Sequence, residues 1–189
     1  MISHQYRCIF IHQRKCAGTS IIRSFGIEPQ MREWHLFNDG VLAPEWAEFL
    51  ATGKPYFVFS VVRNPFDRVV SAWKYLESTK TRSLATALAD PPRPEQGDGH
   101  DYRHFTRQQV EILRPAGSSE LATDYLIRYE DLQQDYAEVC ARIGKAAQVL
   151  PWLNPTPRER DYRGYFDASS RRLAEALFAE DLQVFGYSF

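Results

Sequence analysis

The chain begins with an apolar stretch that passes through a short cationic loop into a second apolar stretch, from Cys8 to Ile22. The lengths of these stretches are those of a buried strand followed by a helix. Backbone N–H groups at the start of such a helix, together with the positive end of its dipole, stabilise an anion. The segment therefore predicts a phosphate-binding cradle, in which Lys15 supplies a charge and Thr19 and Ser20 supply hydroxyl donors.

Two further apolar runs follow, from Tyr56 to Val62 and, more weakly, from Thr123 to Tyr129. The first is nearly continuous in aromatic and β-branched residues, which is the pattern of a strand covered on both faces. With Arg7 to His12 they give three predicted strands, each of which precedes a predicted helix. This alternation predicts an α/β fold, a single domain over residues 1–189 with a central parallel sheet flanked by helices.

The helix after the second strand has clear start signals, because Asn64 can serve as its N-cap and Pro65 occupies its first turn. Its apolar residues recur at helical spacing, and Arg68, Ser71 and Tyr75 fall on the opposite, polar face. The predicted buried stripe consists of Phe66, Val69, Val70, Trp73 and Leu76.

Two more helices are predicted towards the C-terminus. One runs from Asp131 to Ile143, where Gly144 ends the pattern, and the other from Ser170 to Leu182 with Leu173, Leu177 and Phe178 facing inward. The helical pattern is absent between residues 81 and 103, and Pro91 to Gly99 has the composition of a loop. We predict a flexible loop over residues 81–103, of the kind that often forms lids or binding elements.

The charge of the chain excludes some classes of partner. Its formal net charge is −1, which argues against a general nucleic-acid or anionic-membrane binder. The cationic residues gather instead in local clusters, which suit a small polyanion. The clusters are Arg14, Lys15 and Arg23; Arg63 and Arg68; Arg158, Arg160 and Arg163; and Arg171 and Arg172.

Three scattered cysteines, Cys8, Cys16 and Cys140, give neither a disulfide framework nor a zinc site, and they are most simply small core residues. The N-terminal residues lack the apolar core of a signal peptide, and no stretch approaches the roughly 20 apolar residues of a membrane span. We therefore expect a cytoplasmic protein without a metal site or a membrane span.

The first loop differs from the Walker A pattern, in which a glycine opens the loop and Gly-Lys-Ser/Thr closes it. Here Lys15 precedes Gly18 and no glycine opens the loop, which disfavours an ATP or GTP hydrolase. The plan of strand, cradle and helix is nevertheless shared, so a P-loop-like kinase or hydrolase is one alternative. A non-catalytic nucleotide-binding module is another.

A second motif, Val-Arg-Asn-Pro-Phe-Asp-Arg-Val-Val-Ser-Ala-Trp, spans Val62 to Trp73. Together with His-Gln-Arg-Lys-Cys-Ala-Gly-Thr-Ser at His12 to Ser20, it resembles the sulfotransferases that use 3′-phosphoadenosine 5′-phosphosulfate (PAPS), especially the carbohydrate-type branch. Gln13, Arg14 and Cys16 stand where that family usually has Ile, Pro and Thr. The resemblance implies a P-loop-NTPase-like sulfotransferase fold and direct in-line transfer of a sulfuryl group from PAPS to an acceptor hydroxyl, without a metal.

The same resemblance implies roles for both motifs. The loop residues hold the 5′-phosphosulfate, and Lys15 neutralises the departing phosphate, where fixed donors lower the barrier. Arg63 and Ser71 bind the 3′-phosphate; the alternative is a surface ion pair of Arg63 with Asp67 and a solvated Ser71. For Arg68 a structural salt bridge competes with ligand contact. The loop residues are Arg14, Lys15, Cys16, Ala17, Gly18, Thr19 and Ser20.

A late basic segment commonly closes over the nucleotide in sulfotransferases. By resemblance, Arg163 and Gly164 contact the 3′-phosphate or the adenine. The alternative is that Arg158 to Tyr165 is a solvated basic loop.

Transfer to a hydroxyl calls for a general base. His35 is the first choice, because related enzymes often place a histidine between the two motifs and an imidazole accepts a proton near neutral pH. His100 and His104 are alternatives beside the predicted acceptor loop. His12 matches a family position beside the first loop and is interpreted either as structural or as supporting the residues that contact the ligand. Gln108 resembles a glutamine near the acceptor site of some carbohydrate sulfotransferases. The expected acceptor is a carbohydrate or a small metabolite that carries a hydroxyl.

Overall fold

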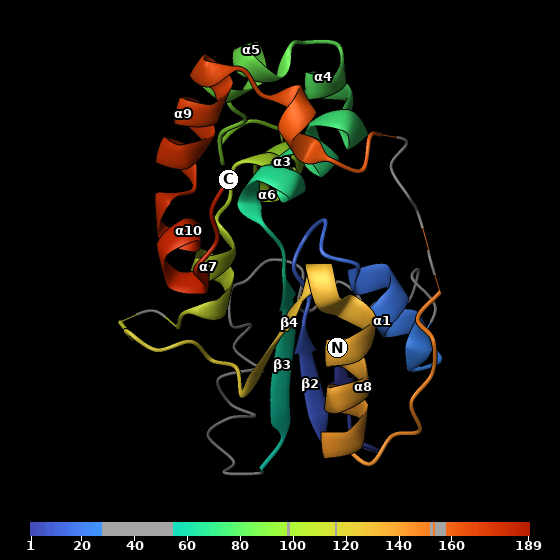
Figure 1. Cartoon of the computed structure of the whole chain (residues 1–189). Helices are drawn as coiled ribbons and strands as arrows, with labels where there is room; N and C mark the ends of the chain where they lie inside the picture. Colours follow the sequence, from blue (N-terminus) through green and yellow to red (C-terminus); the bar gives the residue numbers. More distant parts are fainter. Residues whose placement is uncertain (28–54, 98, 116, 152, 154–157) are drawn as a thin grey trace. The chain divides into compact units, whose positions relative to one another are not determined.

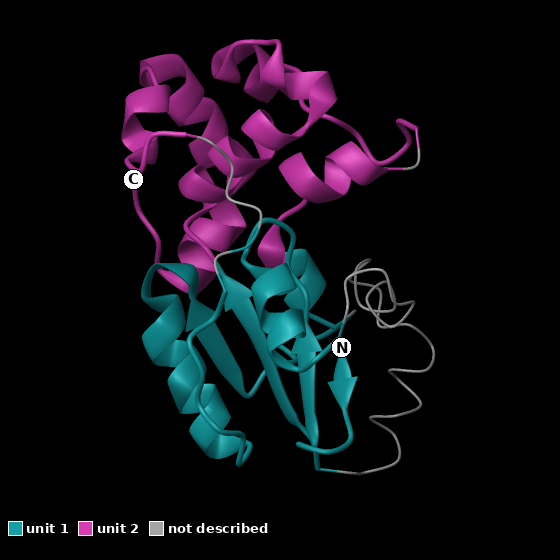
Figure 2. Ribbon diagram, turned by 90° about the vertical axis from the view of Figure 1, so that its right-hand side faces the viewer, with its two compact units in different colours: residues 1–62, 111–153 teal, residues 63–110, 154–189 magenta. Residues whose placement is uncertain are grey.

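The structure is a computed structural model that describes residues 1–27, 55–97, 99–115, 117–151, 153 and 158–189. The chain forms two compact units, each assembled from two separate segments (Figure 2). Unit 1 consists of Met1–Val62 and Glu111–Leu153, and unit 2 of Arg63–Val110 and Asn154–Phe189. Each unit has a hydrophobic core of its own.

The described residues of unit 1 form a four-stranded sheet in the order β1-β2-β3-β4 (Figure 1). β1 pairs antiparallel with β2, whereas β2 with β3 and β3 with β4 are parallel pairs. The three predicted strands and their parallel arrangement are confirmed. β1 is too short to give a periodic signal in the sequence. The strands are β1 (Ile2–Ser3), β2 (Cys8–Ile11), β3 (Phe57–Val62) and β4 (Tyr125–Arg128).

Helices α1 (Gly18–Ser24) and α8 (Leu132–Arg142) pack against one face of this sheet. Successive side chains of a strand point to opposite faces, and the register pairs Phe10 of β2 with Phe59 of β3. Both rings are fully buried in one cluster with side chains of α1 and with Val139 of α8. Burying each such side chain contributes about 1.5–3 kcal/mol, which holds the helices on the sheet. The predicted helix before Gly144 is confirmed as α8.

Unit 2 is helical. Among its described residues, α3, α5 and α9 supply most of the core, together with the fully buried rings of Phe105 and Phe178. α7 (Gln109–Leu113) begins in unit 2 and ends in unit 1. No helix in the described part of the chain has the length and apolarity needed to cross a membrane. The helices of unit 2 are α3 (Pro65–Tyr75), α4 (Glu77–Lys80), α5 (Leu84–Ala89), α6 (His100–Phe105), η3 (Tyr162–Tyr165), α9 (Ala168–Leu177) and α10 (Ala179–Phe185).

Helix α3 begins as predicted. Asn64 is its N-cap and accepts a hydrogen bond from Phe66 N at 3.0 Å, and Pro65 occupies the first turn. The predicted apolar stripe is buried throughout. The polar face predicted for Arg68 and Ser71 is wrong, because these side chains are only 2% and 4% exposed.

Arg68 is a structural residue of unit 2. Its guanidinium donates to His104 O at 3.3 Å and to Arg107 O at 2.8 Å, and it lies over the Phe178 ring. The buried guanidinium of Arg68 is therefore hydrogen-bonded to main-chain carbonyls, and not to a carboxylate as in the salt bridge that the sequence suggested. Hydrogen bonds to a charged group are stronger than neutral ones, which suits a cation at such depth.

The prediction of a loop over residues 81–103 is wrong for α5 and for the start of α6. Ser83 caps α5 by accepting a hydrogen bond from Thr86 N at 3.1 Å. The sequence contains the signal, a serine followed by apolar residues at i, i+3 and i+4. The described residues of the tract from Pro91 to Gly99 do lie outside helices and strands, as predicted. The buried side chains of α5 are Leu84, Ala87 and Leu88.

The last predicted helix is divided in two at Phe178, which ends α9 and precedes α10. Leu173 and Leu177 pack against the core and Phe178 is fully buried, so the predicted inward face is confirmed.

Helix α9 begins with a capping box. The carboxylate of Asp167 accepts a hydrogen bond from Ser170 N at 2.7 Å, and Ser170 Oγ accepts one from Asp167 N at 2.9 Å. The hydrogen bond from Ser170 N, and after it the one that Ser170 Oγ donates to the same carboxylate at 2.7 Å, lower the pKa of Asp167 from its usual 3.8. The ionised cap is thus favoured in the folded state.

This shift predicts an acid-dependent contribution to stability. Because the folded pKa of Asp167 is lowered, the stabilisation is present above the unfolded value of 3.8 and is lost as the pH falls through the folded value. Asp167→Asn keeps a capping oxygen but does not titrate. Urea denaturation should give a difference in unfolding free energy between the wild type and this variant that shrinks below about pH 4. A difference independent of pH would contradict the assignment.

Candidate active site

The loop between β2 and α1 has a strained backbone. Lys15 and Ala17 adopt positive φ angles of 65° and 57°. The left-handed region costs a non-glycine residue about 1–2 kcal/mol. Such strain gathers at ligand clamps, and turns that include left-handed residues form the N–H concavities that bind anions. The left-handed conformations of Lys15 and Ala17 therefore support the predicted cradle. The residue types alone do not indicate them, because neither residue is a glycine.

The N-terminus of α1 lacks a side-chain cap. Its N-cap residue is Ala17, which makes no side-chain hydrogen bond, whereas Asn64 caps α3 with its carboxamide oxygen. The first N–H groups of a helix need acceptors from outside the helix. An anion in the loop before Gly18 would supply them.

Gly18 is required by close packing against His12. A Cβ atom at Gly18 would lie 1.8 Å from His12 Cδ2 and 2.0 Å from His12 Nε2. His12 is buried, and its ring packs against Phe10 with a centroid distance of 6.0 Å. The interpretation of His12 as a structural residue beneath the loop agrees with this packing.

Two loop residues face away from the predicted ligand. Cys16 is fully buried in the core of unit 1 with a free thiol, so only its backbone could contact an anion. Ser20 Oγ donates to Pro151 O at 2.7 Å. The hydroxyl hydrogen of Ser20 is therefore directed to the main chain, contrary to its expected role as a donor to the ligand.

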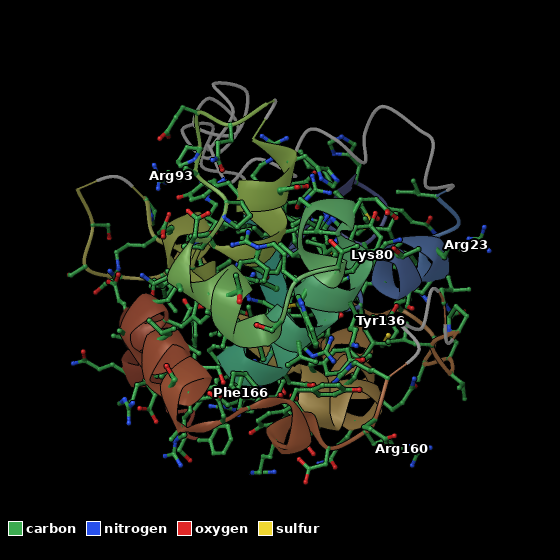
Figure 3. The ribbon with its side chains drawn as sticks, turned by 90° about the horizontal axis from the view of Figure 1, so that it is seen from above. Arg23, Lys80, Arg93, Tyr136, Arg160 and Phe166 are labelled. Atoms are coloured by element: carbon green, nitrogen blue, oxygen red, sulfur yellow. The ribbon has the colours of Figure 1, made fainter. Side chains whose placement is uncertain are left out.

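The other polar side chains of the loop and of α1 differ in exposure. Arg14, Lys15 and Thr19 are half-buried. Arg23, which the sequence groups with Arg14 and Lys15, is exposed and extends outward from α1 (Figure 3). Lys15 and Thr19 thus stay the predicted charge and hydroxyl of the cradle, whereas Arg23 belongs to the exposed surface.

Unit 2 holds a second cationic cluster, in which two arginines converge on Asp67. Arg63 Nε donates to Asp67 Oδ2 at 2.8 Å, and Arg158 Nη2 pairs with Asp67 Oδ1 at 2.5 Å. The three side chains are 5%, 12% and 13% exposed for Arg63, Arg158 and Asp67. The pair of Arg63 with Asp67 was expected as a surface alternative, but it is buried, and Ser71 is buried rather than solvated.

In this cluster two guanidinium groups and one carboxylate lie where little water reaches them. A buried charge is costly unless it is paired. Among the described residues, neither Arg158 Nη1 nor Asp67 Oδ1 has a hydrogen-bond partner of normal geometry, although both atoms are buried. The sequence indicated Arg158 only as one member of a basic segment, because the contact with Asp67 joins residues 91 positions apart, from 67 to 158.

Arg163 and Gly164, the residues chosen from the same basic segment, lie in η3 in different surroundings. Arg163 is exposed, pairs with Asp161 at 3.5 Å and lies over the Tyr162 ring. A Cβ atom at Gly164 would meet nothing within 4 Å. In unit 2, Arg158 rather than Arg163 shares a carboxylate with Arg63.

The three histidines predicted as candidate bases differ in their exposure and hydrogen bonds, and one of them is not described. His35 lies outside the described residues. His104 is 5% exposed and stacks on Tyr75, and its Nδ1 is hydrogen-bonded to His100 O at 2.9 Å. His100 is half-exposed, and its Nδ1 lies 2.9 Å from Asp101 Oδ1. It lines an open cavity of about 550 Å³ with Ser78, Arg82, Asp90, Pro92, Gln96, Gly97 and Asp101.

The carboxylate beside His100 has an altered acidity. Burial raises the pKa of Asp101, but hydrogen bonds from His100 and Ser78 outweigh burial, so that the pKa is lowered overall. Asp101 therefore stays ionised and can orient the His100 imidazole. Within the described residues, no group of three or more His, Cys, Asp or Glu side chains is placed to hold a metal ion.

Comparison with known families identifies the class of protein. The sequence model of the sulfotransferase family matches residues 1–188, which includes both units. The chain therefore belongs to the sulfotransferase family, as the two motifs suggested. Searches of curated proteins and of solved structures found no match.

The contact between Gly18 and His12 can be tested by a double-mutant cycle. Gly18→Ala should lower the free energy of unfolding by about 1–3 kcal/mol, because its methyl group overlaps the His12 ring. His12→Ala should restore part of this loss in the double variant. Gly164→Ala, where the added methyl meets nothing, is the matched control and should change stability by less than about 0.5 kcal/mol. Equal effects of both glycine variants would refute the packing.

Proposed function

We propose that the protein transfers a sulfuryl group from PAPS to the hydroxyl of a carbohydrate or small-metabolite acceptor. Membership of the sulfotransferase family supports sulfuryl transfer. The identity of the donor is inferred from the two motifs. PAPS carries anionic groups at its 5′ and 3′ positions, and the chain places one cationic motif after β2 and another after β3.

The observation that carries the choice of donor is the Asp67 cluster. Arg63 and Arg158 share one carboxylate, and Arg158 Nη1 is a buried donor that has no partner in the part of the chain that the structure describes. A phosphate dianion suits this arrangement, because it accepts several charge-assisted hydrogen bonds and a guanidinium can grip it with two N–H groups. We therefore assign the 3′-phosphate of PAPS to Arg63 and Arg158, with Ser71 as a neighbouring residue of α3.

The loop after β2 is assigned to the 5′-phosphosulfate. During transfer the bond between the sulfur and the bridging oxygen breaks, a bond forms between the sulfur and the acceptor oxygen, and the leaving phosphate gains negative charge. Lys15 and the N–H groups of the loop would stabilise that charge where it develops. The pre-formed left-handed turns at Lys15 and Ala17 fix these donors before the ligand arrives.

The proton of the acceptor hydroxyl requires a base on the far side of the sulfur. We keep His35 in this role and His100 as the alternative, since His100 is half-exposed and paired with Asp101. His104 is less suited, because its ring is buried. The acceptor class follows from the near-neutral charge of the chain, which favours a neutral sugar or metabolite over a long polyanion. A cytoplasmic location stays a prediction.

The 3′-phosphate assignment predicts different effects for three arginines of one segment. Arg158→Ala should weaken binding of adenosine 3′,5′-bisphosphate (PAP) by about 10- to 100-fold, because a hydrogen bond to a charged group is lost. Arg163→Ala should weaken it less, since its side chain is exposed and pairs with Asp161. Arg160, which is exposed and extends outward (Figure 3), supplies the control Arg160→Ala. Isothermal titration calorimetry measures the affinities.

The same titrations distinguish a sulfotransferase that binds PAPS from a kinase or hydrolase that binds ATP or GTP. PAPS or PAP should bind, and ATP with magnesium and GTP should bind more weakly. A clear preference for ATP with magnesium would favour the kinase or hydrolase alternative. Equal losses in the variants of Arg158 and Arg160 would contradict the Asp67 cluster as the phosphate site.

The assignment of the reacting groups predicts effects on kcat. Lys15→Ala should lower kcat about 100-fold or more, because it removes a donor to the leaving phosphate. His35→Ala should lower kcat by a similar factor while leaving PAP affinity nearly unchanged. His100→Ala is the matched variant and should retain activity. The measurement uses labelled PAPS with a screen of hydroxylated acceptors; loss of activity in the His100 variant alone would transfer the role of base to His100.

A further inference from the structure

Arg63 is the first residue after β3, and both of its main-chain polar groups are bound by one side chain. Gln109 Oε1 accepts a hydrogen bond from Arg63 N at 2.9 Å, and Gln109 Nε2 donates to Arg63 O at 3.0 Å. A buried main-chain group without a partner is costly, and Arg63 lies beyond the last residue pair of β3 with β4. Gln109 therefore takes the place that a neighbouring strand would occupy.

Gln109 is itself fixed by a buried carboxylate. Asp181 of α10 is fully buried and accepts hydrogen bonds from Gln109 N at 2.9 Å, Gln109 Nε2 at 3.1 Å and Val110 N at 2.8 Å. Three N–H donors therefore converge on the side chain of one buried residue. Three parts of unit 2 that are distant in the sequence are joined in this way, namely Arg63, the start of α7 and α10.

The chemistry of the position demands a glutamine. Its amide nitrogen has two hydrogens, and the two acceptors are Arg63 O and Asp181 Oδ2. Its oxygen faces the N–H of Arg63. A glutamate would set a carboxylate oxygen against both a carbonyl and the carboxylate of Asp181, and a shorter side chain would not span both partners. The orientation of the amide is therefore determined by its neighbours.

We propose that Gln109, held by Asp181, is a positioning residue that orients Arg63 for the 3′-phosphate. This inference rests on the proposed function, in which Arg63 binds that phosphate. Gln109 fixes the main chain of Arg63, and Asp67 fixes its guanidinium with two contacts of 2.8 Å. An arginine anchored at both ends loses little freedom when it binds an anion, which improves affinity through pre-organisation.

The test compares two nucleotides that differ at the 3′ position, PAP and adenosine 5′-monophosphate (AMP). Calorimetry of the wild type should give a higher affinity for PAP than for AMP, and the ratio measures the contribution of the 3′-phosphate. Gln109→Ala should reduce this ratio about tenfold, because Arg63 is no longer held in register with the phosphate. The affinity for AMP should change little. A merely structural role would lower stability without changing the ratio.

Gln133 provides a matched control in unit 1. Its amide binds both main-chain groups of Leu150 in the same manner, accepting from Leu150 N at 3.1 Å and donating to Leu150 O at 3.4 Å. Gln133→Ala should therefore cost stability and leave the ratio of PAP to AMP affinity at its wild-type value. An equal fall of the ratio in both variants would overturn the assignment of a specific role to Gln109.

A double-mutant cycle identifies the residue through which Gln109 acts. In the Arg63→Ala background, Gln109→Ala should have no further effect on PAP affinity. If Gln109→Ala does not fold, Gln109→Asn and Asp181→Asn carry the same test, since each loosens the contact without emptying the site. An unchanged ratio in these variants would overturn the inference while the proposed function stands. Equal affinities of the wild type for PAP and AMP would instead overturn the 3′-phosphate assignment, and the inference with it.

Discussion

The parallel pairing of β2 with β3 is the constraint on which the rest of the structure depends. The register places Ile11 beside Ser60, and Ser60 Oγ donates to Ile11 O at 2.7 Å, so that the end of β2 is tied to its neighbour. Because parallel strands end at the same edge of a sheet, the chain leaves both strands at one edge. Open α/β sheets bind their ligands at that edge, and both sulfotransferase motifs begin there.

The residues that follow these strands carry charge and strain that a stable core does not require. Lys15 and Ala17 hold left-handed backbone conformations, and two arginines share the carboxylate of Asp67. A buried ion cluster contributes little to stability after its desolvation has been counted. In the proposed function these features serve an anionic ligand, and the hydrogen bonds between Gln109 and Arg63 fix the main chain of one of the two arginines.

Much of the fold could be predicted from the sequence, because short-range patterns decide it. Three apolar runs gave the parallel strands, and Asn64 with Pro65 gave the start of α3. The prediction failed where a pattern was weak or was overridden by packing. The apolar stripe of helix α5 is too short to stand out from the loop-like composition around it. The expected polar face of α3 is buried because Arg68 donates to main-chain carbonyls of residues 104 and 107.

The sequence by itself determined the family and the two motifs for which anion binding is predicted, because each motif is contiguous and can be recognised from its residue types. Only the tertiary structure decided which distant side chains complete them. Arg158 rather than Arg163 joins Arg63 at Asp67, Ser20 turns its hydroxyl to a carbonyl, and Gln109 holds the main chain of Arg63. The physical reason is that buried charges and main-chain groups must find partners in space, and spacing along the chain does not encode which partners these are.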